Sequence, residues 1–388
     1  MFSSLTIIAP FIPLPIDSGG KTRLYQELSN WPSVGSTRNF WTLTNSREDL
    51  EASKTWLKEK SITSQFFKQG HQKQRWSYLK TGVPYWFSET HSQELIAQLK
   101  NQSANNQAEN VAWQVEFTQL LYLYDYLPPQ GLKIFVAHDI ATLSFWRRLK
   151  EEKNPLKICL HWWRWLGIYF YEKKYLPKYD LVIAMSEHDQ KILQKKYRVK
   201  ECWVVPNGLE LATTPRSKST PVLSLGYIGS TQHGPNKKAL TFLINKISPA
   251  LTKAGFVHRV VIAGKNQLNS KQDSPVVNLG PVENVADFYQ EIDYLVAPIF
   301  SGSGTRIKIL ESLAHHTPVI TTAIGAEGLA VRKLGINLVP QAQKTRSWLK
   351  VLQKVSNQPL PNIDKLTLEN LSWQKIFADY FKKINENN

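Results

Sequence analysis

The feature that most limits the fold is a short apolar strand that ends in small residues and leads into a helix, because this unit recurs along the chain. Leu5–Ala9 has the pattern of a buried strand and is followed by the loop Asp17–Gly20 and a helical pattern. After a polar, proline-bearing stretch at residues 211–220, the unit starts again with a strand over residues 222–228 that ends in Gly229-Ser230. Alternating strands and helices predict parallel sheets covered by helices on both faces.

The length of the chain, 388 residues, agrees with two domains. We expect residues 1–210 to form one Rossmann-like domain and residues 211–370 a second one, with ligand-type loops lining a deep cleft between them. The aromatic helical pattern at residues 371–388 is expected to pack back on the first domain. The predicted fold class is therefore α/β, with two doubly wound domains.

Composition excludes several classes of protein. Hydrophobic residues make up 42% of the chain and charged residues 20%, which is typical of a folded protein and not of a disordered one. The sequence has no apolar run of 18 residues, so it predicts no membrane-spanning helix. Two cysteines, Cys159 and Cys202, predict neither a disulfide framework nor a metal site. A cytoplasmic location is the simplest expectation.

The net charge of +17 predicts an anionic partner, such as a phosphorylated small molecule, an acidic membrane surface or nucleic acid. Two segments carry much of this charge. Residues 66–86 contain basic and aromatic side chains and no acid, and residues 145–178 contain nine Lys or Arg, three acids and nine aromatic residues. These segments either contribute to the core and to the solvated surface, or bind an anionic membrane. In the second reading the protein is peripheral at the inner face of the plasma membrane. The sequence contains no nucleic-acid motif, so we expect no nucleic-acid partner.

A second small-residue loop opens another helix. Ser301–Gly304 precedes a helical pattern over Thr305–Ala314, and free backbone N–H groups at such a helix end suit a phosphate. Arg306 and Lys308 add positive charge there, and Glu311 lies one turn further on. The alternative is an ordinary turn whose glycines serve geometry alone.

One histidine occupies a position where ligands commonly bind. His138 directly follows the strand over residues 132–137, and ligands of open parallel sheets lie beyond the carboxyl ends of strands. The alternative for a lone histidine at this position is a structural role.

Several motifs occur in an order that carries a family resemblance. They are Ser18-Gly19-Gly20 with Arg23, His138-Asp139, Ser186-Glu187, Val205–Gly208, Gly229-Ser230 with Pro235–Lys237, the block from Gly302 to Glu311 with Thr317–Val319, and Ser372-Trp373. On these motifs the chain resembles the retaining glycosyltransferases of family four (glycosyl transferases group 1), which have the GT-B fold.

The resemblance implies transfer of a sugar from a nucleotide diphosphate donor, with UDP- or GDP-sugars expected, to a glycan, lipid-linked or other acceptor. It implies catalytic roles for His138, Lys237 and Arg306, no metal and no cofactor, since the nucleotide-sugar is a substrate. His138 matches the histidine near the transferred sugar, Lys237 a diphosphate-binding lysine and Glu311 the carboxylate that binds the ribose. The donor-binding residues that it implies are Gly19, Gly20, Gly229, Ser230, Lys237, Gly280, Val282, Ser303, Gly304, Thr305, Arg306, Lys308 and Glu311.

The chain departs from the family pattern at two positions. Ser303 stands where many members have a first glutamate that touches the transferred sugar, and Ser230 stands where many have an arginine. We expect Arg306 to replace that arginine. The readings left open are an active transferase in polysaccharide biosynthesis, a sugar-nucleotide epimerase, and a degenerate module that binds nucleotide-sugars without catalysis.

Overall fold

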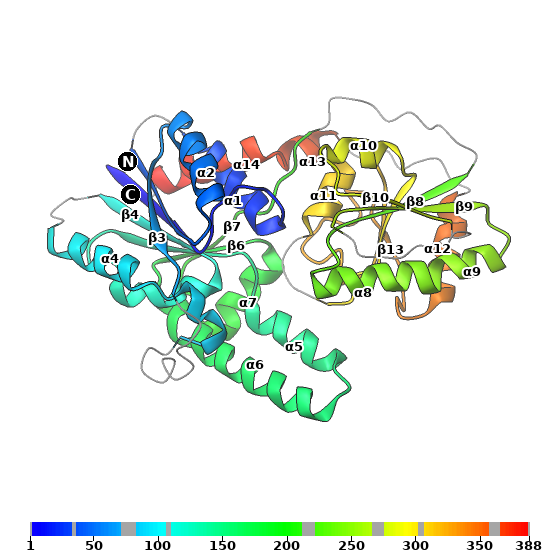
Figure 1. Ribbon diagram of the computed structural model, residues 1–388, viewed down its shortest axis with the longest axis horizontal. Helices are drawn as coiled ribbons and strands as arrows, with labels where there is room; N and C mark the ends of the chain where they lie inside the picture. Colours follow the sequence, from blue (N-terminus) through cyan, green and yellow to red (C-terminus); the bar gives the residue numbers. More distant parts are fainter. Residues whose placement is uncertain are drawn as a thin grey trace. The chain divides into compact units, whose positions relative to one another are not determined.

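The protein is described from a computed structural model that covers residues 2–32, 36–70, 83–105, 110–211, 222–265, 275–301, 306–356 and 365–386. The chain divides into two compact units (Figure 1). Unit 1 comprises Met1–Pro206 together with Trp373–Asn388, and unit 2 comprises Asn207–Ser372. Each unit is an α/β structure built on a parallel sheet, which confirms the predicted fold class.

Unit 1 is built on a parallel sheet whose described strands follow the order β3-β2-β1-β4-β5-β6-β7. Their bounds are β1 Ser4–Ala9, β2 Thr37–Thr44, β3 Thr63–Lys68, β4 Val111–Glu116, β5 Leu132–Ala137, β6 Leu181–Ala184 and β7 Cys202–Val204. The first strand therefore lies in the interior of the sheet, and the order reverses between β1 and β4. At such a reversal two neighbouring loops diverge, which leaves room for a ligand at the carboxyl ends of the strands.

The helices of unit 1 alternate with its strands, as the sequence predicted. The α-helices are α1 Gly19–Ser29, α2 Arg47–Glu59, α4 Gln93–Asn105, α5 Ala141–Glu151, α6 Pro155–Tyr175, α7 Glu187–Tyr197 and α14 Trp373–Glu386, and the 3-10 helices are η1 Tyr85–Thr90, η2 Thr118–Tyr126 and η3 Leu176–Lys178. Gly19 and Gly20 were predicted to lie in a loop, but they form the first turn of α1. Their backbone N–H groups therefore belong to a helix N-terminus, where such groups have no partner within the helix.

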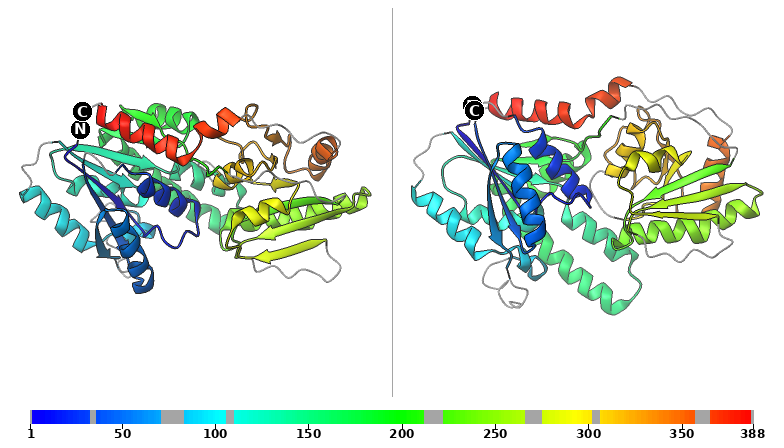
Figure 2. Two further views of the ribbon diagram at one scale, coloured as in Figure 1. Left: turned by 90° about the horizontal axis from the view of Figure 1, so that it is seen from above. Right: turned by 45° about the horizontal axis from the view of Figure 1, so that its top comes forward.

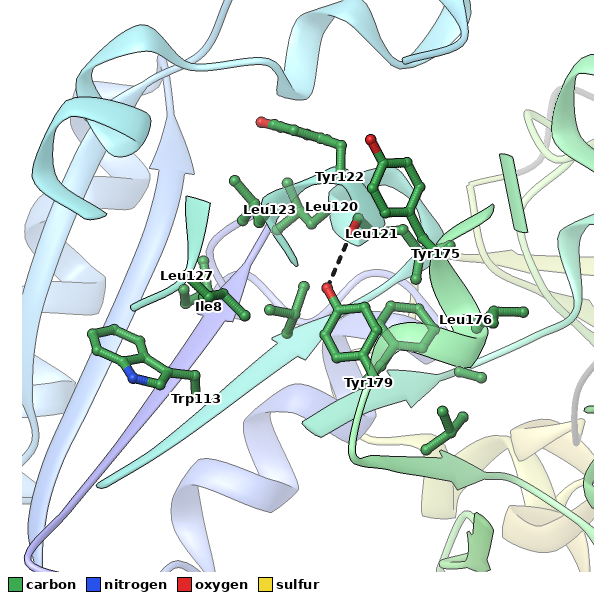
Figure 3. Close-up of a cluster of buried hydrophobic side chains, with 14 of the residues drawn as sticks. Ile8, Trp113, Leu120, Leu121, Tyr122, Leu123, Leu127, Tyr175, Leu176 and Tyr179 are labelled. Atoms are coloured by element: carbon green, nitrogen blue, oxygen red, sulfur yellow. Dashed lines mark hydrogen bonds between the residues drawn. The ribbon is translucent and has the colours of Figure 1, made fainter. Parts of the chain in front are cut away.

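Two hydrophobic clusters cover the two faces of this sheet, because successive side chains of a strand point to opposite sides. Ile7 packs in a cluster with residues of α1 and α14, whereas Ile8 packs with residues of η2, α6 and α7. Figure 3 shows part of the second cluster, in which the hydroxyl group of Tyr179 donates a hydrogen bond of 3.1 Å to the carbonyl oxygen of Leu121. Figures 1 and 2 show α14, in red, lying against the unit that also contains the N-terminal strand.

Unit 2 has a second parallel sheet, whose described strands follow the order β10-β9-β8-β11-β12-β13. The strands are β8 Leu223–Ile228, β9 His258–Ala263, β10 Val276–Gly280, β11 Tyr294–Ala297, β12 Val319–Thr321 and β13 Asn337–Leu338. The helical segments are α8 Gly234–Phe242, the π-helical turn η4 Leu243–Ile247, α9 Ser248–Lys253, α10 Val285–Gln290, α11 Ile307–Ala314, α12 Thr345–Ser356 and α13 Lys365–Asn370. The order again reverses beside the first strand of the unit, between β8 and β11.

Helices α5 and α6 form a hairpin that extends from the sheet of unit 1 (Figure 1). A contribution of residues 145–178 to the core was one of the two readings, and in α6 the buried side chains lie only in the C-terminal half. Ile168 is fully buried, whereas Trp162 is 50% exposed and Leu156, at the start of the helix, is 81% exposed. Within the described ranges, no helix combines the length and hydrophobicity that crossing a bilayer requires.

Candidate functional site

Three neighbouring strands of unit 2 end in glycines whose backbone angle φ is positive. These are Gly229 after β8, Gly264 after β9 and Gly280 at the end of β10, with φ values of 147°, 113° and 70°. Consecutive strand ends are joined by backbone hydrogen bonds, 3.0 Å from Gly229 N to Ala263 O and 2.8 Å from Gly264 N to Gly280 O. A Cβ atom on Gly264 would lie 2.7 Å from the carbonyl oxygen of Gly229, so a larger residue would separate the strands. The three glycines thus add no side chains of their own at this edge of the sheet.

Lys308, in the first turn of α11, is buried against this edge of the sheet. Its ammonium group donates hydrogen bonds to Ile228 O at 2.7 Å, to Asn236 Oδ1 at 3.0 Å and to the hydroxyl oxygen of Tyr227 at 3.0 Å. Three donors are all that an ammonium group has. The group also lies 4.2 Å from the centre of the Tyr227 ring. Burial lowers the pKa of Lys308 to about 7, although the carboxylate of Glu311 opposes this shift.

Glu311 follows Lys308 by almost one turn on the same helix. The hydroxyl group of Tyr289 lies 3.4 Å from Glu311 Oε2 and 3.0 Å from the carbonyl oxygen of Lys308. Burial raises the pKa of Glu311, and the nearby ammonium of Lys308 opposes this shift. The structure thus brings together the lysine and the carboxylate that the sequence placed at one site.

Arg306 is the N-terminal cap residue of α11, where its side chain makes no capping hydrogen bond. A positive charge at a helix N-terminus is unfavourable for the helix itself, because the helix dipole is already positive there. Two cations within three residues, Arg306 and Lys308, therefore oppose the stability of α11. This arrangement favours an anion-binding role over a purely structural one.

The structure says less about the other residues of unit 2 that were predicted to bind the donor. Lys237 is exposed in the first turn of α8, and Val282 is half-buried against the core of the unit. The hydroxyl group of Ser230 donates a hydrogen bond of 3.3 Å to the carbonyl oxygen of Lys265. Ser303, Gly304 and Thr305, and with them most of the predicted phosphate loop, lie outside the described residues.

In unit 1, His138 follows β5 and packs against two groups. Its Nε2 atom lies 2.5 Å from Glu116 Oε2, and the ring of Phe117 stacks on the imidazole with 3.6 Å between ring centres and 3° between planes. The side chain of His138 is 10% exposed, so a small part of it is accessible. Burial and the positive charge of Arg23 lower the pKa of His138 to about 3, which keeps the imidazole neutral at neutral pH.

Gly20 lies close to the ring of Phe117. A Cβ atom on Gly20 would lie 3.0 Å from the phenyl ring, and Phe117 itself adopts a positive φ of 68°. The structure thus joins two separately predicted residues, Gly20 and His138, through an aromatic ring that the sequence did not single out.

A buried polar group behind His138 was also missed. Gln114 and Glu116 of β4 point to the same side of the sheet, and both are fully buried. The amide nitrogen of Gln114 donates to Glu27 Oε1 at 2.6 Å and to Glu116 Oε1 at 2.5 Å. Arg23 of α1 is buried beside both carboxyl groups. The sequence does contain a signal for this group, because Gln114 and Glu116 are two polar residues spaced two apart in the otherwise apolar strand Val111–Glu116.

Comparisons with known proteins agree with this architecture. Residues 223–355 match the family model of the glycosyl transferases group 1. Two curated relatives, the D-inositol 3-phosphate glycosyltransferases of Rhodococcus erythropolis (strain PR4 / NBRC 100887) and Rhodococcus opacus (strain B4), are each 31% identical over 97 residues. This match covers 24% of the chain and spans only 22% of the length of either relative.

Solved structures resemble the chain over nearly its whole length. Sucrose-phosphate synthase from Thermosynechococcus elongatus has a TM-score of 0.70 at 12% identity, with 99% of this chain and 98% of that chain covered. HepE from Anabaena, solved in complex with UDP and glucose, has a TM-score of 0.67 at 12% identity, with 99% and 100% covered. The fold of the chain is the GT-B fold, and the region that matches the group 1 glycosyl transferase model lies within unit 2. The resemblance to this class of glycosyltransferase is therefore confirmed.

Proposed function

We propose that the protein transfers a sugar from a nucleoside diphosphate donor, UDP- or GDP-sugar, to an acceptor hydroxyl. The observation that carries the proposal is the position of the group 1 match. It covers residues 223–355, which contain the glycine-lined strand ends and the buried residues Lys308 and Glu311. Backbone amides at helix and strand ends, together with two cations, suit a diphosphate.

The chemistry of the reaction assigns a role to each of these groups. As the bond between the sugar and the diphosphate breaks, negative charge grows on the departing oxygen, and fixed positive charges stabilise it. Arg306 supplies such a charge, and Lys237 lies on an exposed helix turn from which its long side chain can reach a ligand. Glu311 accepts hydrogen bonds from the ribose hydroxyls.

The transfer that we propose retains the configuration of the sugar. The acceptor hydroxyl attacks from the side that the diphosphate leaves, and its proton passes to a phosphate oxygen of the leaving group. His138 binds a hydroxyl group of the transferred sugar through the exposed part of its side chain. In this proposal the positive side chains and backbone amides take the place that a metal ion has in other transferases, so no metal is needed.

We further propose that the acceptor is a glycan or a lipid-linked sugar used in polysaccharide biosynthesis, at the inner face of the plasma membrane. The support is the α5–α6 hairpin, on which exposed apolar side chains accompany basic ones. Trp163 is 61% exposed and Phe170 60%, and residues 145–178 carry nine Lys or Arg against three acids. Apolar and basic groups on one helix are typical of binding to anionic lipid surfaces. The second basic segment, residues 66–86, lies mostly outside the described residues.

A thermal-shift panel of UDP-, GDP-, ADP- and dTDP-sugars tests the donor proposal. We expect one donor to raise the melting temperature, and Glu311→Gln to weaken the affinity for it at least tenfold, or about 1.4 kcal/mol. Glu291→Gln is the matched control, because Glu291 is an exposed carboxylate of the same unit that pairs with Arg259. If no donor binds the wild-type protein, the proposal fails. Binding without hydrolysis or transfer would instead identify a degenerate module, to which Ser303 in place of a glutamate would point.

A further inference from the structure

Buried polar side chains of unit 1 are joined by a series of hydrogen bonds that runs from Tyr380 to His138. The hydroxyl group of Tyr380, in α14, donates a hydrogen bond of 2.6 Å to Gln114 Oε1. The amide oxygen of Gln114 therefore faces α14, and its two N–H groups face the carboxyl groups of Glu27 and Glu116. Because a tyrosine hydroxyl donates to oxygen and an amide nitrogen only donates, this order fixes the orientation of the amide.

The same reasoning extends to the histidine. Glu116 Oε1 accepts from Gln114, and Glu116 Oε2 faces the Nε2 atom of His138 at 2.5 Å. An ionised carboxylate only accepts hydrogen bonds, so Nε2 must carry the ring proton. The other nitrogen, Nδ1, then has a free lone pair and can accept a hydrogen bond but cannot donate one.

We propose that Glu116 is a positioning residue that places the proton of His138 on Nε2, and that Gln114 and Tyr380 hold Glu116 in this arrangement. The C-terminal helix α14 thereby controls which nitrogen of His138 accepts a hydrogen bond. The catalytic consequence rests on the proposed glycosyl transfer, in which Nδ1 accepts a hydrogen bond from a sugar hydroxyl. The position of the proton does not depend on any reaction and is tested separately.

The charged groups around this series of hydrogen bonds influence the pH range in which Glu116 is ionised and the ring proton of His138 lies on Nε2. The charged groups that act on His138 are Arg23 and Glu27 of α1 and the neighbouring Asp139. The guanidinium group of Arg23 donates a hydrogen bond of 2.9 Å to Pro206 O and lies 5.5 Å from the ring of Phe377. Burial raises the pKa of Glu116 to about 7. Below that pH the carboxylic acid donates to Nε2, and the ring proton moves to Nδ1.

Nitrogen NMR of the protein with 15N-labelled histidine tests the proposal directly, with the His138 signal identified by its loss in His138→Asn. At pH 8.5 we expect the wild-type proton on Nε2. In Glu116→Gln, the new side-chain oxygen must accept from Gln114, so the new NH2 group faces His138 and the ring proton moves to Nδ1. A wild-type proton on Nδ1 at pH 8.5, or a proton that stays on Nε2 in Glu116→Gln, would overturn the proposal.

Tyr380→Phe tests the contribution of α14 with little change of shape. We expect a mixture of the two tautomers of His138, because the amide of Gln114 can then rotate. Tyr179→Phe is the matched control, since it removes another buried hydroxyl group of unit 1 whose partner is the carbonyl oxygen of Leu121 (Figure 3). We expect the control to keep the proton on Nε2. Equal spectra for the two variants would show that α14 has no such role.

Kinetics with the donor identified by thermal shift add the catalytic readout. We expect Tyr380→Phe to lower kcat about tenfold and to leave the KM for the donor unchanged, and Tyr179→Phe to change neither. Equal losses in both variants would indicate general destabilisation and contradict the positioning role. If the wild-type protein transfers no sugar, the proposed function fails while the NMR result still decides the proton position.

Discussion

The ammonium group of Lys308 lies 3.0 Å from the side-chain oxygen of Asn236, and this hydrogen bond joins α11 to α8 in unit 2. The amide nitrogen of Asn236 in turn donates to the carbonyl oxygen of Ser230 at 3.1 Å. Lys308 therefore holds the turn after β8 in place through Asn236. Direct contact between Lys308 and a phosphate requires it to exchange one of its three protein partners.

Gly229 should tolerate no side chain. Its φ of 147° is unfavourable for other residues, and a Cβ atom would lie 2.8 Å from Lys308 Nζ and 2.9 Å from Asn236 Nδ2. We expect Gly229→Ala to lower the free energy of unfolding by ~1–3 kcal/mol, measured by urea denaturation. Gly234→Ala is the control, because Gly234 lies in the first turn of α8 with no atom within 4 Å of its added Cβ. A loss of equal size in the control would contradict this explanation.

Arg306 should contribute to binding of the diphosphate. We expect Arg306→Ala to weaken the affinity for the nucleoside diphosphate of the donor at least tenfold, about 1.4 kcal/mol, because it removes a charged contact. Isothermal titration calorimetry measures this affinity. Arg332→Ala removes an exposed arginine of the same unit and should leave it unchanged. Equal affinity in Arg306→Ala and the wild type would rule the role out.

Binding of a diphosphate should be accompanied by proton uptake at Lys308. Burial lowers the pKa of this side chain to about 7, so most molecules carry neutral Lys308 at pH 8.5. A bound diphosphate favours the charged form and raises the pKa, so the complex takes up a proton above pH 7. Calorimetry in buffers with different ionisation enthalpies should detect up to one proton at pH 8.5 and almost none at pH 6. Uptake that persists in Lys308→Met would assign the proton to another group.

The α5–α6 hairpin should bind anionic vesicles. Leu156 and Trp163 are 81% and 61% exposed, and burying an apolar side chain of this size contributes roughly 1.5–3 kcal/mol when complete. We expect the double variant Leu156→Ser, Trp163→Ser to weaken sedimentation with phosphatidylserine-containing vesicles at least tenfold. Val257→Ser removes an exposed apolar side chain of unit 2 and should have no effect. Binding by the wild type that is insensitive to salt and to lipid charge would contradict the proposal.

The sequence predicted the sheet of unit 1 closely where strands are short, apolar and bounded by turns. The strand Leu132–Ala137, for example, has the predicted bounds. The 3-10 helix Thr118–Tyr126 was missed, because its nearly continuous apolar side chains show neither a helical nor a strand period. In unit 2 the helical segment that begins with α8 continues through a π-helical turn to Lys253, with Pro249 in the first turn of α9.

The candidate site was predicted in part. His138, Lys308 and Glu311 stand in local motifs that a single segment of sequence reveals. Glu116 does not, because its role depends on Glu27 and on Tyr380, which is more than 260 residues away from its partner Gln114. Burial and long-range pairing of this kind leave almost no trace in the local sequence pattern.

Helix α14 also has a consequence for the order in which the protein is made. Residues 373–386 belong to the core of unit 1, yet the ribosome produces them after the whole of unit 2, Asn207–Ser372. During synthesis unit 2, a continuous segment, is complete first. Until residues 373–386 have been made, Gln114 lacks its hydrogen bond from the hydroxyl group of Tyr380. Unit 1 is therefore completed after unit 2, and the buried surroundings of His138 are complete only once residues 373–386 have been made.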